Sequence, residues 1–150
     1  MSKAVSDFAE PETNVFDSLL GYHLRRLSVV VMTDLTQALS PLDLKPADAS
    51  VLFVIAANPG ITQSEVGKAL GILRANMAPL IGALLKRDLI ERQPVDGRSQ
   101  ALKLSSAGKN LCARARLVTK EHENRLFGRL SASAKNRLIA QLRELWDQSQ

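Results

Sequence analysis

A short basic hairpin within residues 89–104 is the feature that most constrains the fold of this chain. Residues 89–93 and 100–104 are brief runs in which apolar residues recur at every second position, as in β-strands. Between them lies PVDGRS, residues 94–99, whose Asp-Gly pair tolerates the positive φ of a tight turn. The pattern predicts two strands joined by a turn with Arg98 at its tip. Such an arginine can reach an anion, although a solvated surface hairpin is the simpler alternative.

Two helical patterns directly precede the hairpin. Thr62 and Glu65 have the spacing of a capping box, so a helix is expected to start at Ile61 or Thr62. Gly71 is expected to end that helix in a left-handed conformation, and helical periodicity predicts a second helix over residues 74–87. Helix, glycine turn, helix and hairpin together form a winged helix-turn-helix. The apolar residues expected to face inward are Val66, Ala69 and Leu70 in the first helix and Leu73, Met77, Leu80, Ile81 and Leu84 in the second.

The segment DGRSQALKLSSAG, residues 96–108, resembles the wing signature of the MarR-type transcriptional regulators. Residues 61–70, 86–87 and 89–92 are also similar to that family, and with the flanking helices the resemblance covers nearly the whole chain. It implies a mainly α fold with a small β-hairpin wing. In such a fold a winged helix-turn-helix lobe binds DNA, and the N- and C-terminal helices form a dimerisation bundle.

Three residues depart from the family's usual pattern. Leu73 stands where a serine commonly caps the second helix, so a hydrogen bond worth about 1 kcal/mol is expected to be missing or supplied by another group. Asp88 replaces the usual glycine after that helix and tolerates the left-handed conformation less easily. Pro79 cannot donate to the Ala75 carbonyl and is expected to bend or open that turn.

The remaining helices are read from apolar stripes and breakers. Residues 15–39 predict one extended amphipathic helix, and Pro46 is expected at the first position of another, which ends at Asn58. Its expected core residues are Ala49, Leu52, Phe53, Ile55 and Ala56. After the wing, Ser105 or Ser106 is expected to cap a long helix that ends at Phe127 or Leu130, and a final helix is expected to begin near Ser131 or Ser133.

Long helices at both ends of a 150-residue chain favour a homodimer, because neither terminal segment has a lobe of its own that would bury so much apolar surface. The family resemblance implies the same, whereas an ordinary intrachain core is the alternative. The expected organisation is a mobile N-terminal arm at 1–13, a helical dimerisation region at 14–40 and 106–150, and the winged helix-turn-helix lobe at 41–105.

The charge is distributed unevenly along the chain. The formal net charge is +5, with a pI near 9.7. Residues 1–59 contain 4 basic and 7 acidic side chains, whereas residues 60–109 and 110–150 each contain 8 basic and 4 acidic ones. The winged segment therefore lies in the positive part of the chain, which favours an acidic partner such as double-stranded DNA.

The candidate DNA-binding residues follow from this arrangement. On the outer face of the second helix Arg74 and Asn76 can read guanine and adenine edges, and Ala75 or Pro79 can contact thymine methyl groups. The resemblance implies that Arg98 enters the minor groove and that Asp96 braces it by a salt bridge. The residues suited to phosphate contacts are Lys68, Lys86, Arg87, Arg92 and Lys103. For each of them simple solvent exposure is the alternative.

A cluster on the first helix is the candidate effector site. Tyr22, His23, Arg25 and Arg26 place an aromatic ring, a titratable ring and two cations within about one and a half turns, and Phe53 is expected to face them. Such a group suits a small aromatic or anionic ligand, including an acyl-coenzyme A thioester. The alternative is that Arg25 and Arg26 pair with acids such as Asp17 or Asp34.

Other classes of protein receive little support. The sequence has no glycine-rich phosphate loop, serine elbow or metal-ligand cluster, so no enzyme activity, cofactor or metal is expected. Cys112 is expected to be a buried structural residue. No signal peptide or transmembrane segment is expected, which favours a cytoplasmic protein without a membrane partner. A winged-helix interaction module that does not bind specific DNA remains the alternative function, with Leu73, Pro79 and Gly82 as its support.

Overall fold

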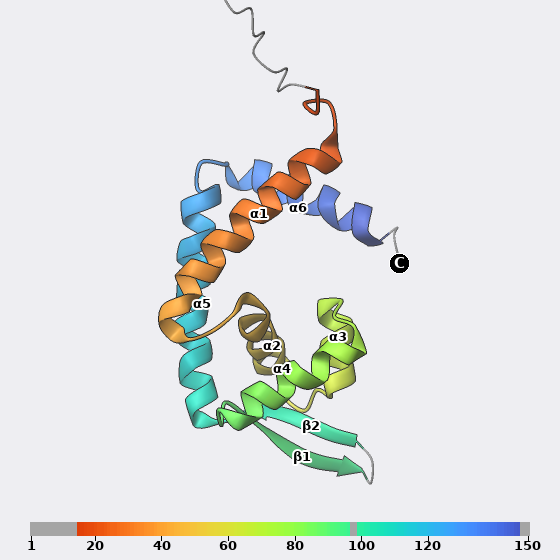
Figure 1. Ribbon diagram of the computed structural model, residues 1–150, viewed down its shortest axis with the longest axis vertical. Coiled ribbons are helices and arrows are strands. Elements are labelled where there is room, and N and C mark those ends of the chain that lie inside the picture. Colours follow the sequence, from red (N-terminus) through yellow and green to blue (C-terminus); the bar gives the residue numbers. More distant parts are fainter. Residues whose placement is uncertain (1–14, 97–98, 148–150) are drawn as a thin grey trace, which may run out of the picture.

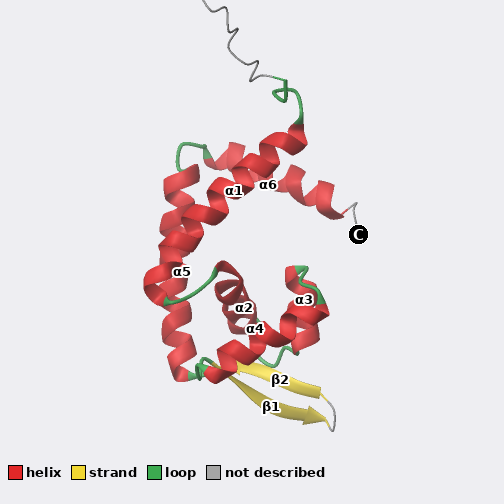
Figure 2. Cartoon of the chain, viewed as in Figure 1, coloured by secondary structure: helices red, strands yellow, loops and turns green. Residues whose placement is uncertain are grey.

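The computed structural model describes residues 15–96 and 99–147; the expected arm at 1–13 and the expected wing tip at Arg98 lie outside these ranges. Figure 1 shows a lower lobe formed by α2, α3, α4 and the hairpin, and an upper arm formed by α1, α6 and part of α5. Figure 2 shows that, in the described residues, strands occur only in the hairpin. The elements are α1 (Leu20–Leu39), the 3-10 helix η1 (Ser40–Leu42), α2 (Pro46–Ala57), α3 (Gln63–Leu70), α4 (Arg74–Lys86), β1 (Ile90–Asp96), β2 (Ser99–Leu104), α5 (Ser106–Phe127) and α6 (Ala132–Asp147).

One hydrophobic core holds the lobe together. It takes buried side chains from every element of the lobe and from the ends of both arm helices that join it. Because each helix of the lobe contributes an apolar face to the same core, α3 and α4 are held in a fixed relation to the hairpin. The largest fully buried side chains include Leu39, Leu52, Ile55, Val66, Met77, Ile81, Leu84, Ile90 and Leu102.

The local signals that delimit α3 are confirmed. Thr62 Oγ1 accepts from the Glu65 N–H at 3.3 Å, and the Thr62 N–H donates to the Glu65 carboxylate at 2.8 Å. The Thr62 N–H and the Thr62 hydroxyl both donate to the Glu65 carboxylate, and these two bonds lower the pKa of that carboxyl. Gly71 follows α3 with φ 63°, in the left-handed region. The capping box therefore fixes where α3 begins, and Gly71 fixes where the turn of the helix-turn-helix begins.

Two residues expected to face inward do not. Ala69 is exposed, because the buried face of α3 is formed instead by Val66 and by Gly67, which lies against Met77. Leu73 is 74% exposed, because it is the N-cap residue before α4 and does not follow the helical stripe. Its side chain makes no cap hydrogen bond, as expected.

The helix α4 runs without interruption across Pro79. The missing N–H of Pro79 therefore does not end the helix, although it leaves the Ala75 carbonyl without its usual partner. Asp88, after α4, adopts φ 52° and takes the left-handed conformation expected at the position where the family usually has glycine.

The hairpin is antiparallel and pairs Ile90 with Leu104 and Arg92 with Leu102. Its strands extend further toward the tip than expected, since β1 continues to Asp96 and β2 begins at Ser99, with a bulge between Pro94 and Asp96. The Leu102 N–H also donates to the Ile61 carbonyl at 2.8 Å. This bond fastens the wing to the start of α3.

The start of α5 is fixed against the start of the wing. Ser105 caps α5 by accepting from the Gly108 N–H at 2.9 Å, and the Ser105 N–H donates to the Leu89 carbonyl at 3.1 Å. A Cβ at Gly108 would lie 1.8 Å from that same carbonyl oxygen. Only glycine allows α5 to approach Leu89 so closely.

The helix α1 begins later than expected. Residues 15–18 form a turn, and α1 starts at Leu20. The turn is held by the side chain of His23, whose Nε2 lies 2.8 Å from the Asp17 carbonyl oxygen, and by stacking of Phe16 on Tyr22. These contacts replace the first helical turn that the apolar stripe predicted. By contrast, α2 starts at Pro46 as expected.

An ionic cluster in which only the His122 side chain is buried joins α1 to α5. His122 is only 2% exposed and its Nδ1–H donates to Asp34 Oδ2 at 2.7 Å. Arg125 Nη2 donates to the same oxygen. These two hydrogen bonds, the one from Arg125 first, hold the pKa of the Asp34 carboxyl below its ordinary value. Asp34 therefore pairs with His122 and Arg125 of α5 and does not pair with Arg25 or Arg26.

The arm leaves much apolar surface exposed. Within the described part of the chain, α6 contains no buried residue, and Trp146 is 63% exposed. Leu20 on α1 is 62% exposed. In those described residues no single helix is long and apolar enough to cross a membrane, and α3 with α4 passes such a test only as a pair bent by 116°.

The close approach at Gly108 gives a stability prediction. Gly108→Ala should lower the free energy of unfolding by at least about 3 kcal/mol, because the new methyl group collides with backbone that cannot move aside. Gly82→Ala is the matched control, because a Cβ there meets nothing within 4 Å; it should stabilise α4 by about 0.5–1 kcal/mol. Urea unfolding of both variants measures this. Equal effects of the two substitutions would contradict the packing.

The Asp34 cluster gives a pH prediction. A carboxyl whose pKa is lowered by folding contributes stability above its unfolded pKa of about 3.9, and this contribution is lost as the pH falls through the lower folded value. The difference in unfolding free energy between wild type and Asp34→Asn should therefore be largest near pH 7 and shrink toward pH 3. Asp17→Asn, an exposed control, should show no such trend. A difference for Asp34→Asn that is independent of pH would refute the role of the cluster.

Candidate nucleic-acid interface

A groove of about 850 Å³ lies between α3, the start of α4 and the hairpin. It brings together three of the expected cationic residues from three separate elements: Lys68 of α3, Arg74 of α4 and Arg92 of β1. All three side chains are exposed. A groove with cations on each of its walls suits a polyanionic backbone, because several phosphates can be neutralised together.

Polar groups that were not predicted from the sequence to contact DNA also line this groove. They come from the first turn of α3 and from β2. Side chains of this kind position a duplex by hydrogen bonds to phosphate oxygens. A helix start lying next to a basic hairpin would have been the only sequence signal for them. The polar lining residues are Thr62, Gln63, Ser64 and Gln100.

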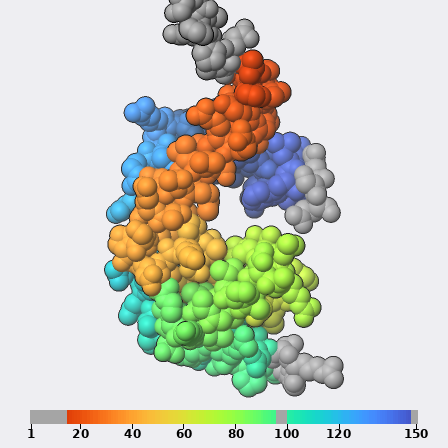
Figure 3. All heavy atoms as spheres, in the orientation of Figure 1, coloured from red at the N-terminus to blue at the C-terminus, as the bar shows by residue number. Residues whose placement is uncertain are grey.

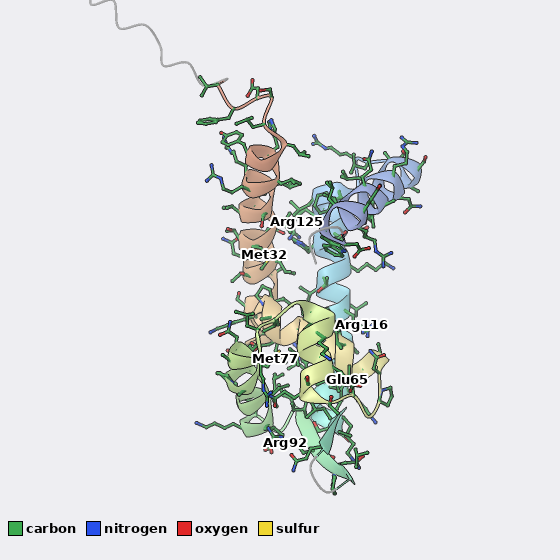
Figure 4. The ribbon with its side chains drawn as sticks, turned by 90° about the vertical axis from the view of Figure 1, so that its right-hand side faces the viewer. Met32, Glu65, Met77, Arg92, Arg116 and Arg125 are labelled. Carbon is green, nitrogen blue, oxygen red and sulfur yellow. The ribbon has the colours of Figure 1, made fainter. Side chains whose placement is uncertain are left out.

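The hairpin cations differ in how they are engaged. Arg92 Nη1 donates to Gln100 Oε1 at 3.3 Å, which holds its guanidinium across the two strands. Lys103 forms an ion pair with Glu91 at 3.0 Å and does not line the groove. Figure 4 shows Arg92 on the hairpin, at the base of the lobe. Arg92 is therefore better placed than Lys103 for a contact with phosphate.

The outer face of α4 is small and exposed. Ala75, Asn76 and Lys86 are exposed there, as are Pro79 and Gly82. Met77, Ile81 and Leu84 occupy the opposite, buried face. Since few bulky side chains project from the outer face, a duplex can approach the α4 backbone closely. Of the expected wing contacts, Asp96 is described only in its backbone, at the end of β1, and Arg98 lies outside the described residues.

A second concavity, of about 380 Å³, lies on α1 at the expected effector site. Tyr22, Arg25 and Arg26 line it together with Val29 and Val30. Arg26 Nη1 donates to the Tyr22 hydroxyl at 3.0 Å, and both guanidinium carbons lie within 6 Å of the Tyr22 ring centroid, at 5.6 and 5.7 Å. The ring therefore holds two cations beside one apolar wall.

Two residues assigned to this effector site lie elsewhere in the single chain. His23 turns toward the Asp17 carbonyl and does not line the concavity. Phe53 lies on α2 under Arg116, whose guanidinium carbon is 5.2 Å from the ring centroid. Figure 4 shows Arg116 at the level of the lobe, below Met32 and Arg125 of the arm. Within one chain, Phe53 therefore does not lie beside Tyr22.

The remaining candidates for chemistry are structural. Cys112 is buried, with Sγ 3.8 Å from the Leu52 carbonyl oxygen. In the ranges 15–96 and 99–147 no three His, Cys, Asp or Glu side chains are grouped as a metal site. No role was predicted for His122, and in the structure its ring is hydrogen-bonded to Asp34.

A helix-turn-helix with a hairpin wing and a cationic groove defines a DNA-binding regulator of the winged-helix class. The MarR family model matches residues 42–99, which include α2, α3, α4 and β1. A transcriptional repressor, CouR, bound to a 23-mer DNA duplex is 36% identical, with a TM-score of 0.84; the match covers 91% of this chain and 99% of that one. The chain belongs to the MarR family of DNA-binding transcriptional regulators.

Two further relatives extend the comparison. CouR bound to p-coumaroyl-CoA is 35% identical, with a TM-score of 0.80, over 91% of this chain and 97% of that one. A transcriptional regulatory protein described for the hcr operon of Thauera aromatica is 28% identical over 148 residues, 97% of this chain and 89% of that protein. The family named from the hairpin and its flanking helices is thus confirmed.

Proposed function

We propose that the protein is a repressor that binds a palindromic operator as a homodimer and leaves it when an aromatic acyl-CoA thioester binds. The observation that carries the DNA-binding part is the convergence of Lys68, Arg74 and Arg92 on one groove beside α4. The helix α4 enters the major groove of the DNA, where Arg74 and Asn76 read base edges. The cations of the hairpin lie along the phosphate backbone of the duplex. The resemblance assigns Arg98 to the minor groove.

The homodimer is supported by the apolar faces of the arm. Large apolar residues are exposed along α1 and α6. A monomeric protein usually covers apolar side chains that are grouped in this way. A second copy of the chain covers both faces if the two arms pack as one bundle. Two lobes fastened to one bundle can then present two α4 helices about 34 Å apart, one helical turn of DNA. The residues concerned include Leu24, Leu27, Val30, Leu138, Ile139 and Trp146.

The effector part is supported by the α1 concavity. Tyr22 supplies an aromatic wall, and Arg25 and Arg26 supply cations suited to the phosphates of coenzyme A. The relative CouR has been solved with p-coumaroyl-CoA bound. We take the same chemical class, an aromatic acyl group joined to coenzyme A, as the effector of this protein.

The DNA-binding proposal is tested by titrating the region upstream of the protein's own gene. Arg74→Gln and Arg92→Gln should each weaken binding about tenfold or more, since each removes a charge-assisted contact from both subunits. If Arg92 neutralises one phosphate per subunit, its loss should reduce the slope of log affinity against log salt by about 2 per dimer. Arg129→Gln, at the exposed turn between α5 and α6, removes the same charge away from the groove and should change neither quantity.

Unchanged binding by the groove variants would refute this interface. A folded dimer that binds no duplex at low or high salt would instead favour a winged-helix interaction module.

The effector proposal is tested with p-coumaroyl-CoA as the probe. It should release the wild-type protein from DNA, and Arg25→Gln with Arg26→Gln should raise the concentration needed by about tenfold or more, because both cations face the phosphates. DNA affinity without the probe should be unchanged, since α1 lies outside the groove. Coenzyme A alone and p-coumarate alone are the controls. Release by the probe that is insensitive to the double substitution would place the effector elsewhere.

A further inference from the structure

The C-terminal end of α4 is joined to both helices of the arm. Arg87, the residue that follows α4, donates from Nη1 to the Asp43 carbonyl oxygen at 2.7 Å, and its Nη2 lies 3.5 Å from Asp43 Oδ2. Asp43 directly follows η1, which continues α1 without a break. The end of the helix that is proposed to read DNA is therefore tied to the end of an arm helix.

Asp43 provides a rigid acceptor for this bond. Its neighbours Leu42 and Leu44 are both buried in the core of the lobe. The residue itself adopts φ 51°, in the left-handed region, and its N–H donates to the Ser40 carbonyl at 2.9 Å. The carbonyl oxygen of Asp43 is thus held by the fold, while its carboxylate is almost fully exposed.

The next residue of the chain joins the other arm helix. Asp88 also has a left-handed backbone, and its carbonyl accepts from Ser105 Oγ at 2.6 Å. Ser105 is the N-cap of α5. The ends of α1 and α5 therefore meet at the same turn after α4. Figure 1 shows this turn at the foot of α5, beside the start of the hairpin.

We infer that Arg87 is a positioning residue: it fastens α4 to the arm through Asp43, so that the arm determines the direction in which α4 faces DNA. Arg87 was predicted from the sequence to contact phosphate, but in the structure its guanidinium is bonded to Asp43. A guanidinium fits this role because two of its nitrogens reach the carbonyl and the carboxylate at once, whereas an ammonium is a single point charge. The inference rests on the proposed function, since it concerns how the two α4 helices are held apart.

The test compares Arg87→Gln with Lys86→Gln, its neighbour on the exposed face of α4. Both variants lose one positive charge per subunit. They are titrated against a palindromic duplex of native spacing and against the same duplex with one base pair inserted between the half-sites, at several salt concentrations. The operator is first located by footprinting with the wild-type protein.

Arg87→Gln should reduce the preference for the native spacing by about fivefold to tenfold, because a loosened α4 tolerates both duplexes. Its salt slope should equal that of wild type. Lys86→Gln should keep the spacing preference and reduce the salt slope by about 2 per dimer, as the loss of one phosphate contact per subunit does. Arg87→Lys should behave like Arg87→Gln, since the charge remains but the two-nitrogen contact is lost.

Asp43→Asn gives a second, independent variant that keeps the carbonyl acceptor and the tolerance for a left-handed backbone. It should weaken the spacing preference in the same direction but less. Simple charge effects would instead raise its affinity for both duplexes equally, and that result would overturn the inference. A reduced salt slope with intact spacing preference in Arg87→Gln would overturn it as well. Failure of the wild-type protein to bind either duplex would count against the proposed function itself.

Discussion

The contact between Gly108 and the Leu89 carbonyl is the constraint on which the architecture depends. It brings the N-terminus of α5 against the first residue of the wing with no room for a side chain. The Ser105 N–H and hydroxyl bond the neighbouring carbonyls of Leu89 and Asp88. Hairpin, α4 and α5 therefore share one joint, and from it α5 runs along the side of the molecule to the arm (Figure 1).

The lobe and the arm, which meet at this joint, differ in how far they bury their apolar side chains. The lobe buries its apolar residues in one core that the ends of α1 and α5 complete within the same chain, so the relation of α3, α4 and the hairpin does not require a second subunit. The arm does the opposite, because α6 has no buried residue among those described and α1 exposes leucines and valines along its length. The space-filling view shows an opening between α6 and the lobe, with the two parts joined along one side (Figure 3).

The fold was predictable from the sequence where a short local signal determines the structure. Thr62 with Glu65, Gly71, Pro46 and Ser105 each act within one turn of chain. Gly71, Pro46 and Ser105 mark the ends of elements where expected, and α3 begins at Gln63, one residue after the expected Thr62. The start of α1 was not predictable in this way, because a continuous apolar stripe hides the turn that the His23 side chain stabilises.

The site was predictable only in part, because its contacts join distant segments. The grouping of Lys68, Arg74 and Arg92 follows once the winged helix is recognised. The bond from Arg87 to Asp43 spans 44 residues, and that from His122 to Asp34 spans 88, so no spacing rule relates the partners. Phe53 was assigned to the effector site by type alone, and the packing of α2 against α5 places it under Arg116 instead.

The central claim is that two copies of the chain hold a duplex together through paired lobes. The most direct measurement is the affinity and stoichiometry on a palindromic operator, compared with a duplex in which one half-site has been scrambled. Two chains should bind each palindromic duplex, and the affinity should fall about a hundredfold or more on the scrambled one, because the second contact becomes intramolecular once the first has formed. One chain per duplex with equal affinity for both would contradict the claim.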